Sequence, residues 1–468
     1  MKTIRFIKCA TILSCAILLL TQCSQPKEKK PYNVLFLIVD DMNDYGFYEG
    51  HPNAKTPYLD EFKETALTFR NAYCASPLCT PSRAATFSGL YPHTTGAYFN
   101  GCDPWRQSDI LKDSTETLPE LFKRNGYTTF GLGKTYHAKL EEGRDTLNWD
   151  NKYYGGGFGP FPDKEHQFKG KFWGAQAFPD SAFPDVQNTN ATIDFLNKSH
   201  DKPFFAALGL WRPHSPFTCP QRFYDMYDVN EIEVPKGYLE GDLDDVDSIH
   251  LGLVDAFGRW SISGAKTPDN WKKMLHAYLA CNTFADWNIG RVIETLNSSI
   301  YANNTIVVFW SDNGYHCGEK NHWEKGSLWE QTVLTPMAIR VPNANGNGKV
   351  CTKPVNLVDL YPTLVELCGI RQPIQKIEGV SLTQLIDNPE SEWSLPAVTT
   401  LGIEYSSVRN EQYRYIRFID GSEELYDNKK DPYEFNNLAG DENLQSVKDE
   451  LAKSIPTKWA PELPGRRN

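Results

Sequence analysis

Apolar runs typical of buried strands alternate with helical patterns along most of this chain. Residues 34–39 form a continuous apolar run, and similar runs recur at 128–132, 204–210 and 305–310. Strands that are apolar on both faces are typical of a parallel sheet covered by helices. Helices are predicted between and after these strands, over residues 56–69, 81–90, 118–125, 272–296 and 355–367. The alternation predicts a large, wound, mostly parallel α/β sheet flanked by helices.

The pattern changes after about residue 385. Residues 406–419 alternate like an antiparallel strand, Asp420-Gly421 is a hairpin turn signal, and residues 442–455 predict a closing helix. We therefore expect a large domain over residues 32–384. A smaller C-terminal α+β subdomain with an antiparallel sheet is expected over residues 385–468.

Two stretches of the large domain interrupt this alternation. Residues 140–185 are rich in glycine, proline and aromatic residues and predict an irregular excursion over the functional site. The acidic run at residues 242–247 predicts a solvated loop.

Residues 1–22 have the features of an export signal. Three basic residues precede an apolar run over residues 9–20, which is too short for a membrane-spanning helix. The run ends in Leu20-Thr21-Gln22-Cys23, which resembles a bacterial lipobox, and residues 23–31 are a polar tether. We expect a lipoprotein with a lipid on Cys23, in the periplasm or outer membrane of a Gram-negative bacterium. Plain signal cleavage nearby is the alternative.

Loss of residues 1–22 removes three basic and no acidic residues and moves the formal net charge from −11 to −14. A net acidic chain argues against a nucleic-acid partner, and an anionic substrate would require locally concentrated basic residues. Eight of the 11 cysteines follow Cys23 without a CxxC pair, so disulfide pairing stays open.

Polar residues follow each predicted central strand, where wound sheets hold their ligands. They are Asp40 and Asp41, Lys134 and His137, His214, and Asp312 and Asn313. Three carboxylates and an amide offer hard oxygen ligands, which suit Ca²⁺ or Mg²⁺ and not Zn²⁺.

Cys79-Thr80-Pro81-Ser82-Arg83, followed by Ser88-Gly89, is the strongest local signal. It resembles the maturation motif of the type I, formylglycine-dependent sulfatase family of the alkaline phosphatase superfamily. The resemblance continues through residues 33–41, 131–137, 211–216, 305–325 and 425–439. The segments 133–137 and 212–217 are similar to iduronate-2-sulfatase-like members.

This resemblance implies that Cys79 is oxidised to 3-oxoalanine (formylglycine) by a formylglycine-generating or anaerobic sulfatase-maturing enzyme. The hydrated aldehyde is a geminal diol, in which one hydroxyl attacks sulfur and the other then loses its proton, expelling sulfate and restoring the aldehyde. One Ca²⁺ per chain would be held by Asp40, Asp41, Asp312, Asn313 and the modified Cys79.

The resemblance also implies roles for the basic residues. Arg83 would hold the diol, Lys134 and His137 would contact the diol and sulfate with His137 as the base, and His214 would be the general acid, supported by Lys325. Substrate contacts are expected from Trp105, Arg106, His316 and His322.

The implied activity is hydrolysis of sulfate esters on an acidic polysaccharide of the ulvan, carrageenan or glycosaminoglycan type. Two alternatives stay open. One is a phosphonate or phosphate diester hydrolase of the same superfamily, and the other is a catalytically dead, lipid-anchored glycan-binding protein.

Overall fold

The computed structural model describes residues 31–48, 50–137, 140, 142–151, 155–161, 173–257 and 268–465. Contacts divide the chain into Met1–Pro31 and Tyr32–Asn468. The predicted export signal, Cys23 and all but the last residue of the tether lie outside the described residues. No helix in the described part of the chain is long and apolar enough to cross a membrane.

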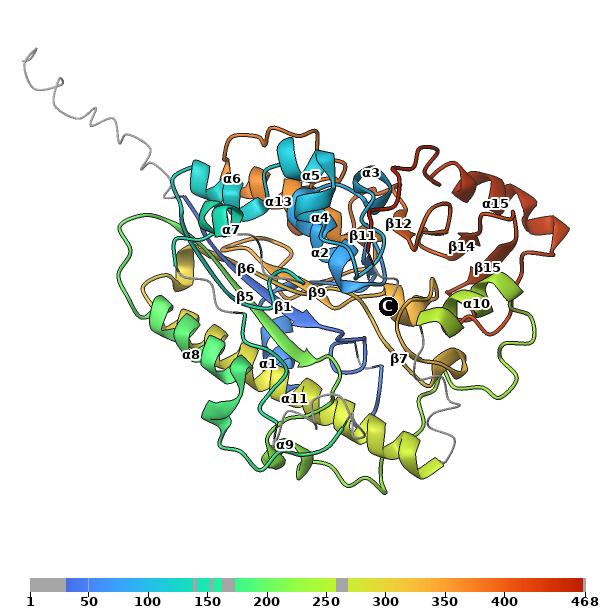
Figure 1. The fold of residues 1–468 in the computed structure, drawn as a ribbon, viewed down its shortest axis with the longest axis horizontal. Helices are drawn as coiled ribbons and strands as arrows, with labels where there is room; N and C mark the ends of the chain where they lie inside the picture. Colours follow the sequence, from blue (N-terminus) through green and yellow to red (C-terminus); the bar gives the residue numbers. More distant parts are fainter. Residues whose placement is uncertain are drawn as a thin grey trace, which may run out of the picture. The chain divides into compact units, whose positions relative to one another are not determined.

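A seven-stranded sheet forms the core of the second unit (Figure 1). The central strand β1 (Asn33–Asp40) is buried throughout and pairs in parallel with β5 (Phe204–Pro213) and β6 (Thr305–Ser311). The sheet order is β10-β2-β9-β6-β1-β5-β4, and β9 (Met337–Arg340) is antiparallel to both of its neighbours. The outer strands are β4 (Thr128–Gly133), β2 (Leu67–Phe69) and β10 (Val350–Cys351). The predicted mostly parallel sheet is confirmed.

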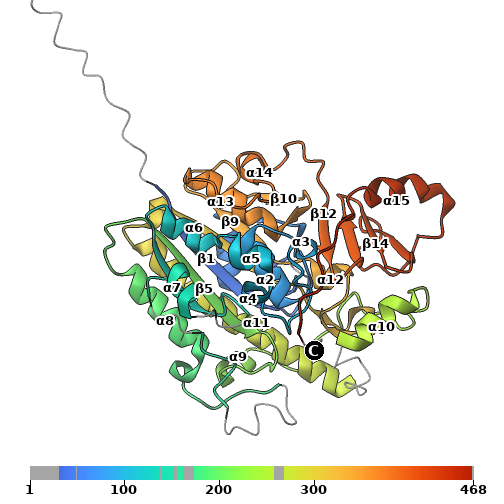
Figure 2. The ribbon, with the colours of Figure 1, turned by 45° about the horizontal axis from the view of Figure 1, so that its top comes forward.

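Helices cover both faces of this sheet. Figures 1 and 2 show α2, α6 and α13 on one side and α1, α8 and α11 on the other. Their bounds are α1 (Pro57–Lys63), α2 (Cys79–Ser88), α6 (Leu118–Arg124), α8 (Pro184–Leu196), α11 (Pro268–Ser298) and α13 (Leu360–Cys368). Helix α2 ends at Gly89, whose φ of 70° is left-handed and suits glycine.

A four-stranded antiparallel sheet forms the C-terminal part, as predicted. Its strands are β12 (Ala397–Thr400), β13 (Ser406–Arg409), β14 (Tyr413–Arg417) and β15 (Glu423–Asp427), and α15 (Gln445–Ala452) contacts β13 and β14. The single strand expected over residues 406–419 is wrong. A turn at Asn410 divides it, because the Asn410 Oδ1 atom accepts from the N–H groups of Gln412 and Tyr413.

Shorter elements complete the described chain. The strands are β3 (Ala72–Tyr73), β7 (His316–Cys317), β8 (Trp323–Glu324) and β11 (Val355–Asn356). The helices are α3 (Pro92–Thr95), α4 (Pro104–Gln107), α5 (Asp109–Asp113), α7 (Glu142–Asn148), α9 (Gln221–Tyr224), α10 (Ser248–Phe257), α12 (Glu330–Val333) and α14 (Thr383–Asp387).

Three further expectations need correction. The helix predicted over residues 56–69 ends at Lys63, and Leu67–Phe69 joins the sheet as β2. The helix predicted over 355–367 begins only at Leu360, after β11 and a 3-10 turn. Residues 140–185 include helix α7, so this stretch is not wholly irregular.

The acidic run at 242–247 is also not wholly solvated. Asp242 is buried, and the Lys320 Nζ atom donates to its Oδ1 atom at 3.0 Å. The buried lysine compensates the buried carboxylate.

Candidate active site

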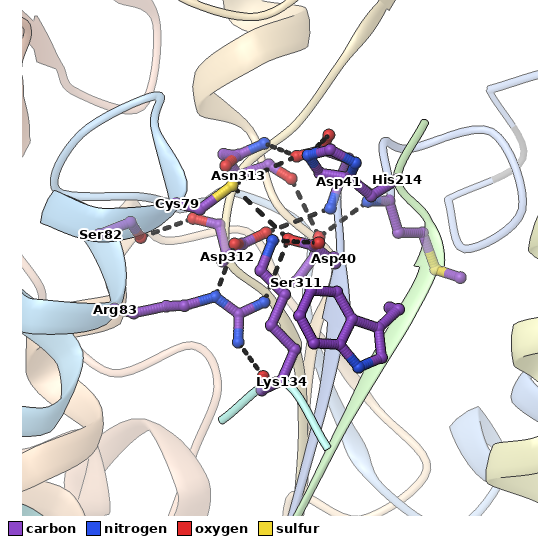
Figure 3. A network of polar contacts seen from close by, with 12 residues as sticks. Asp40, Asp41, Cys79, Ser82, Arg83, Lys134, His214, Ser311, Asp312 and Asn313 are labelled. Carbon is purple, nitrogen blue, oxygen red and sulfur yellow. Dashed lines mark hydrogen bonds and ion pairs between the residues drawn. The ribbon is translucent and has the colours of Figure 1, made fainter. Parts of the chain in front are cut away.

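Two neighbouring strands bring four polar residues to one point (Figure 3). β1 ends at Asp40 and leads into Asp41, and β6 is followed by Asp312 and Asn313. Because β1 and β6 run parallel in register, their carboxyl ends coincide. Asp41 adopts a left-handed φ of 64°, and its N–H donates to the Asp312 Oδ1 atom at 3.1 Å. All four side chains are buried.

Cys79 lies against this cluster as the first residue of α2. Its Sγ atom is 3.5 Å from the Asp40 Oδ1 atom, 3.9 Å from the Asp41 Oδ1 atom and 2.8 Å from the Lys325 Nζ atom. Burial, followed by the negative charge of Asp312, raises the pKa of the Cys79 thiol well above its usual value. The unmodified thiol is therefore a poor nucleophile at neutral pH, despite its place at a helix N-terminus.

Arg83 lies one turn further along the same helix and joins the two strand ends. Its Nε atom donates to the Asp312 Oδ2 atom at 2.8 Å, and its Nη2 atom donates to the Asp40 Oδ1 atom at 3.2 Å. Ser82 donates from its Oγ atom to the Asp312 backbone oxygen at 2.5 Å. The helix that carries Cys79 is thus fixed to both strand ends.

Two lysines complete the buried charges. Lys134, after β4, pairs with Asp40, and Lys325, after β8, pairs with Asp41. Burial alone raises the pKa of Asp40, but Lys134 and other positive neighbours outweigh burial and lower it. Burial lowers the pKa of Lys325, but Asp41 and other negative neighbours outweigh burial and raise it. Asp40 is therefore an anion and Lys325 a cation at neutral pH.

The two predicted histidines also lie at the cluster. The His214 Nε2 atom is 3.6 Å from the Asp41 Oδ2 atom, its Nδ1 atom contacts the Ser215 backbone oxygen, and its side chain is 21% exposed. Burial lowers the pKa of His137 well below its usual value, and the charge of Lys134 lowers it further. His137 is therefore a neutral imidazole at neutral pH.

The cluster fits a hard divalent cation. One ligand atom from each of Asp40, Asp41, Cys79 and Asp312 lies within 4.8 Å of the others. The Asn313 Oδ1 atom is buried without a hydrogen-bond partner among the described residues, and thus offers one more oxygen. Carboxylate and amide oxygens are ligands of Ca²⁺ and Mg²⁺.

The residues predicted to contact the substrate differ in their exposure to solvent. Trp105 is buried and lines a small cavity with Arg83 and His137. Arg106 is 54% exposed and pairs with Asp103 at 3.1 Å.

His316 and His322 lie close together but are buried, with ring centroids 5.5 Å apart. Both rings are shielded from solvent in this structure.

Two residues that support the site were not predicted. Asn100 accepts at its Oδ1 atom from the Thr80 N–H at 2.9 Å and so caps α2 from another segment, because the N-cap residue Leu78 has no capping side chain. Asp185 accepts from the N–H groups of Trp211 and Arg212 at 2.8 and 3.1 Å, which fixes the segment before His214. The sequence shows no motif that links these distant positions.

Family models match nearly the whole described chain. The Sulfatase model matches residues 32–370, and a model described as N-sulphoglucosamine sulphohydrolase, C-terminal, matches residues 318–459. The chain therefore belongs to the sulfatase family and is a hydrolase. The predicted family and enzyme class are confirmed.

Known proteins agree with this family. A sulfatase of Formosa agariphila is 37% identical, with 92% of this chain and 87% of that protein covered. An ulvan-active sulfatase of the same organism is 29% identical, with 96% and 85% covered. Human iduronate 2-sulfatase is 28% identical, with 73% and 70% covered. The crystal structure of a phosphonate monoester hydrolase of Agrobacterium radiobacter shares the fold, with a TM-score of 0.75 at 20% identity and 90% and 94% covered.

Proposed function

We propose that this protein hydrolyses sulfate esters of an acidic sulfated polysaccharide or its oligosaccharides, with an oxidised Cys79 as the nucleophile and Ca²⁺ beside it. The observation that carries the proposal is the position of Cys79 at the start of α2, against Asp40 and Asp41 and within 2.8 Å of the Lys325 Nζ atom. Oxidation to the aldehyde replaces a thiol of raised pKa by a hydrated carbonyl whose hydroxyl attacks sulfur.

The protein's own residues then supply orientation and charge. Arg83 is held by two carboxylates and keeps its guanidinium fixed beside the nucleophile. Lys134 and Lys325 add positive charge in a buried site, where it stabilises an anionic sulfuryl group more strongly than it would in water. Bound Ca²⁺ would be held by Asp40, Asp41, Asp312 and Asn313 and would favour the anionic form of the nucleophile.

Two histidines on different segments provide proton transfer. Neutral His137 takes the proton from the second hydroxyl when sulfate leaves. His214 lies at the open side of the cluster and donates a proton to the departing alcohol. Burial, together with Lys134 and Lys325, outweighs the opposite effect of Asp41 and Asp40 and lowers the pKa of His214, and the negative charge of a bound sulfate ester would raise it.

The substrate class is supported by two relatives. Their names are ulvan-active sulfatase and iduronate 2-sulfatase, and iduronate is an acidic sugar. The similarity to a phosphonate monoester hydrolase concerns the fold and keeps phosphonate and phosphate diesters as the second candidate substrates.

Side-by-side assays test the proposal. The matured protein, with the mass of its Cys79 peptide measured, is given sulfated oligosaccharides of ulvan, carrageenan and glycosaminoglycans together with phosphate diester and phosphonate ester analogues. We expect sulfate release from an acidic oligosaccharide and its loss in Cys79→Ala, with Cys74→Ala, a second buried cysteine, as the matched control. Faster turnover of the phosphorus esters, or normal turnover by Cys79→Ala, contradicts the proposal.

A further inference from the structure

The segment at residues 155–161 is attached to the end of β5, next to His214. The Trp211 Nε1 atom donates to the Gly155 backbone oxygen at 2.6 Å, and the Arg212 Nη2 atom donates to the Phe158 backbone oxygen. Both donors belong to the strand end that leads into His214. The backbone of this segment is therefore held at the active site by side chains from the sheet.

Phe158 is the side chain through which this segment contacts the proposed machinery. Its ring centroid is 4.8 Å from that of His214, with an angle of 31° between the ring planes, and 4.6 Å from that of Trp211, with an angle of 72°. The Lys134 Nζ atom lies 5.8 Å from the Phe158 centroid and 5.4 Å from the Trp211 centroid. Phe158 thus packs on an imidazole and lies near a buried ammonium group.

Among the described residues, His214 has few other restraints. Its polar contacts are the Ser215 backbone oxygen at its Nδ1 atom and Asp41 at its Nε2 atom, and the latter distance of 3.6 Å is long for a hydrogen bond. A flat aromatic ring packed on one face of the imidazole limits the rotation that these contacts leave open. Removing the ring would leave the imidazole free to turn away from the leaving group.

We propose that Phe158 is a positioning residue that holds the imidazole of His214 in line with the departing alcohol. The inference rests on the proposed function, because it requires His214 to be the general acid. A positioned acid contributes about 10²–10⁴-fold, and a displacement of about 1 Å costs about 10²-fold. Loss of Phe158 should therefore cost about 10- to 100-fold, and only where the leaving group needs a proton.

The test compares two sulfate esters whose leaving groups differ in how much they need a proton donor. 4-Nitrophenyl sulfate releases a stable phenolate, whereas phenyl sulfate releases a more basic one and depends more on a proton donor. We expect Phe158→Ala to lower kcat/KM for phenyl sulfate by about 10- to 100-fold and to leave 4-nitrophenyl sulfate nearly unchanged. Phe158→Tyr, which keeps the ring, should restore the wild-type ratio of the two esters.

Two controls separate positioning from a general effect on folding. Phe161 lies on the same segment, and among the described residues it makes no ring contact with His214 or Trp211, so Phe161→Ala should leave the ratio unchanged. In a His214→Ala background, Phe158→Ala should have no further effect, because both changes remove the same contribution. Thermal unfolding of each variant confirms that it is folded.

The outcomes distinguish this inference from the proposed function. Equal losses for both esters in Phe158→Ala, or a full additional loss in the His214→Ala background, overturn the role of Phe158 alone. Equal losses for both esters in His214→Ala itself overturn the general-acid assignment and, with it, the role of Phe158.

Discussion

Asn100 completes the helix that carries Cys79, although it lies on a different segment. Its Oδ1 atom accepts from the Thr80 N–H at 2.9 Å, and this N–H belongs to the first turn of α2. Asn100→Ala should lower the free energy of unfolding by about 1 kcal/mol, as for other lost helix caps. Asn100→Asp keeps the acceptor and should retain most of that energy. Urea unfolding measures both variants, and an Ala variant as stable as the wild type would exclude the capping role.

At the scale of residues, the sequence predicted the main cluster of acidic and amide side chains but not the residues that hold this cluster's neighbours in place. Asp40, Asp41, Asp312 and Asn313 were predictable because each directly follows a buried strand, and parallel strand ends converge. Asn100 was not predictable, because its partner is set by the path of the chain and not by a local motif.

Asp286 caps the N-terminus of α1 from another segment, as Asn100 caps α2. It lies on α11 and accepts from the N–H groups of Leu59 and Tyr58 at 2.7 and 3.3 Å, at the start of α1, where Thr56 offers no side-chain cap. Burial raises the pKa of Asp286 from 3.8 to about 8. Between pH 3.8 and about 8, the folded protein therefore keeps a proton on Asp286 that the unfolded chain has released.

This difference in proton binding determines how the free energy of unfolding changes with pH. The contribution of Asp286 is complete below its ordinary pKa of 3.8 and is lost as the pH rises through about 8. Asp286→Asn removes the titration, so the stability of the wild type relative to this variant should fall between these two pH values. Denaturant unfolding of both proteins at several pH values measures it, and parallel pH profiles would contradict the raised pKa.

Elements of the sheet differ in how well the sequence predicts them. β1 was predictable because six of its eight buried residues, 34–39, form a continuous apolar run. β2 has three residues, next to the end of α1, and its strand state depends on pairing with β9 and β10. A pairing between segments about 270 residues apart leaves no periodic pattern in the local sequence. The predicted helix over residues 56–69 therefore included the residues of β2.

At the scale of the whole molecule, one buried arginine joins the two sheets. Arg414 on β14 donates to the Glu434 Oε1 atom and the Ser407 Oγ atom, each at 2.6 Å, and contacts Glu330 on α12, which leads to β9. Arg414→Met removes the nearest cation from two buried carboxylates, of which Glu330 keeps only the more distant Arg409 at 3.6 Å, and should cost about 3–5 kcal/mol of stability. Arg417→Met, on an exposed position of the same strand, is the matched control for chemical unfolding. Equal stabilities of the two variants would refute the network.

The proposed metal ion would also act on the whole molecule. Its ligands come from the adjacent carboxyl ends of β1 and β6 and from α2, so an ion that binds only the folded state should stabilise it. At a free concentration 100 times the Kd, the gain is about 2.7 kcal/mol. A chelator should lower the Tm and the activity, and added Ca²⁺ should restore both. A Tm that is indifferent to chelation would count against the site.

Cys79 is synthesised early and enclosed late. Lys325, one of the groups that enclose it, follows 246 residues later in the chain. At about 5–20 residues per second, a ribosome needs about 10–50 s to add that length. During this interval the contact between Lys325 and the thiol cannot yet form. Because Cys79 is buried in the folded protein, an enzyme that oxidises it would need to reach it before the chain has folded around it.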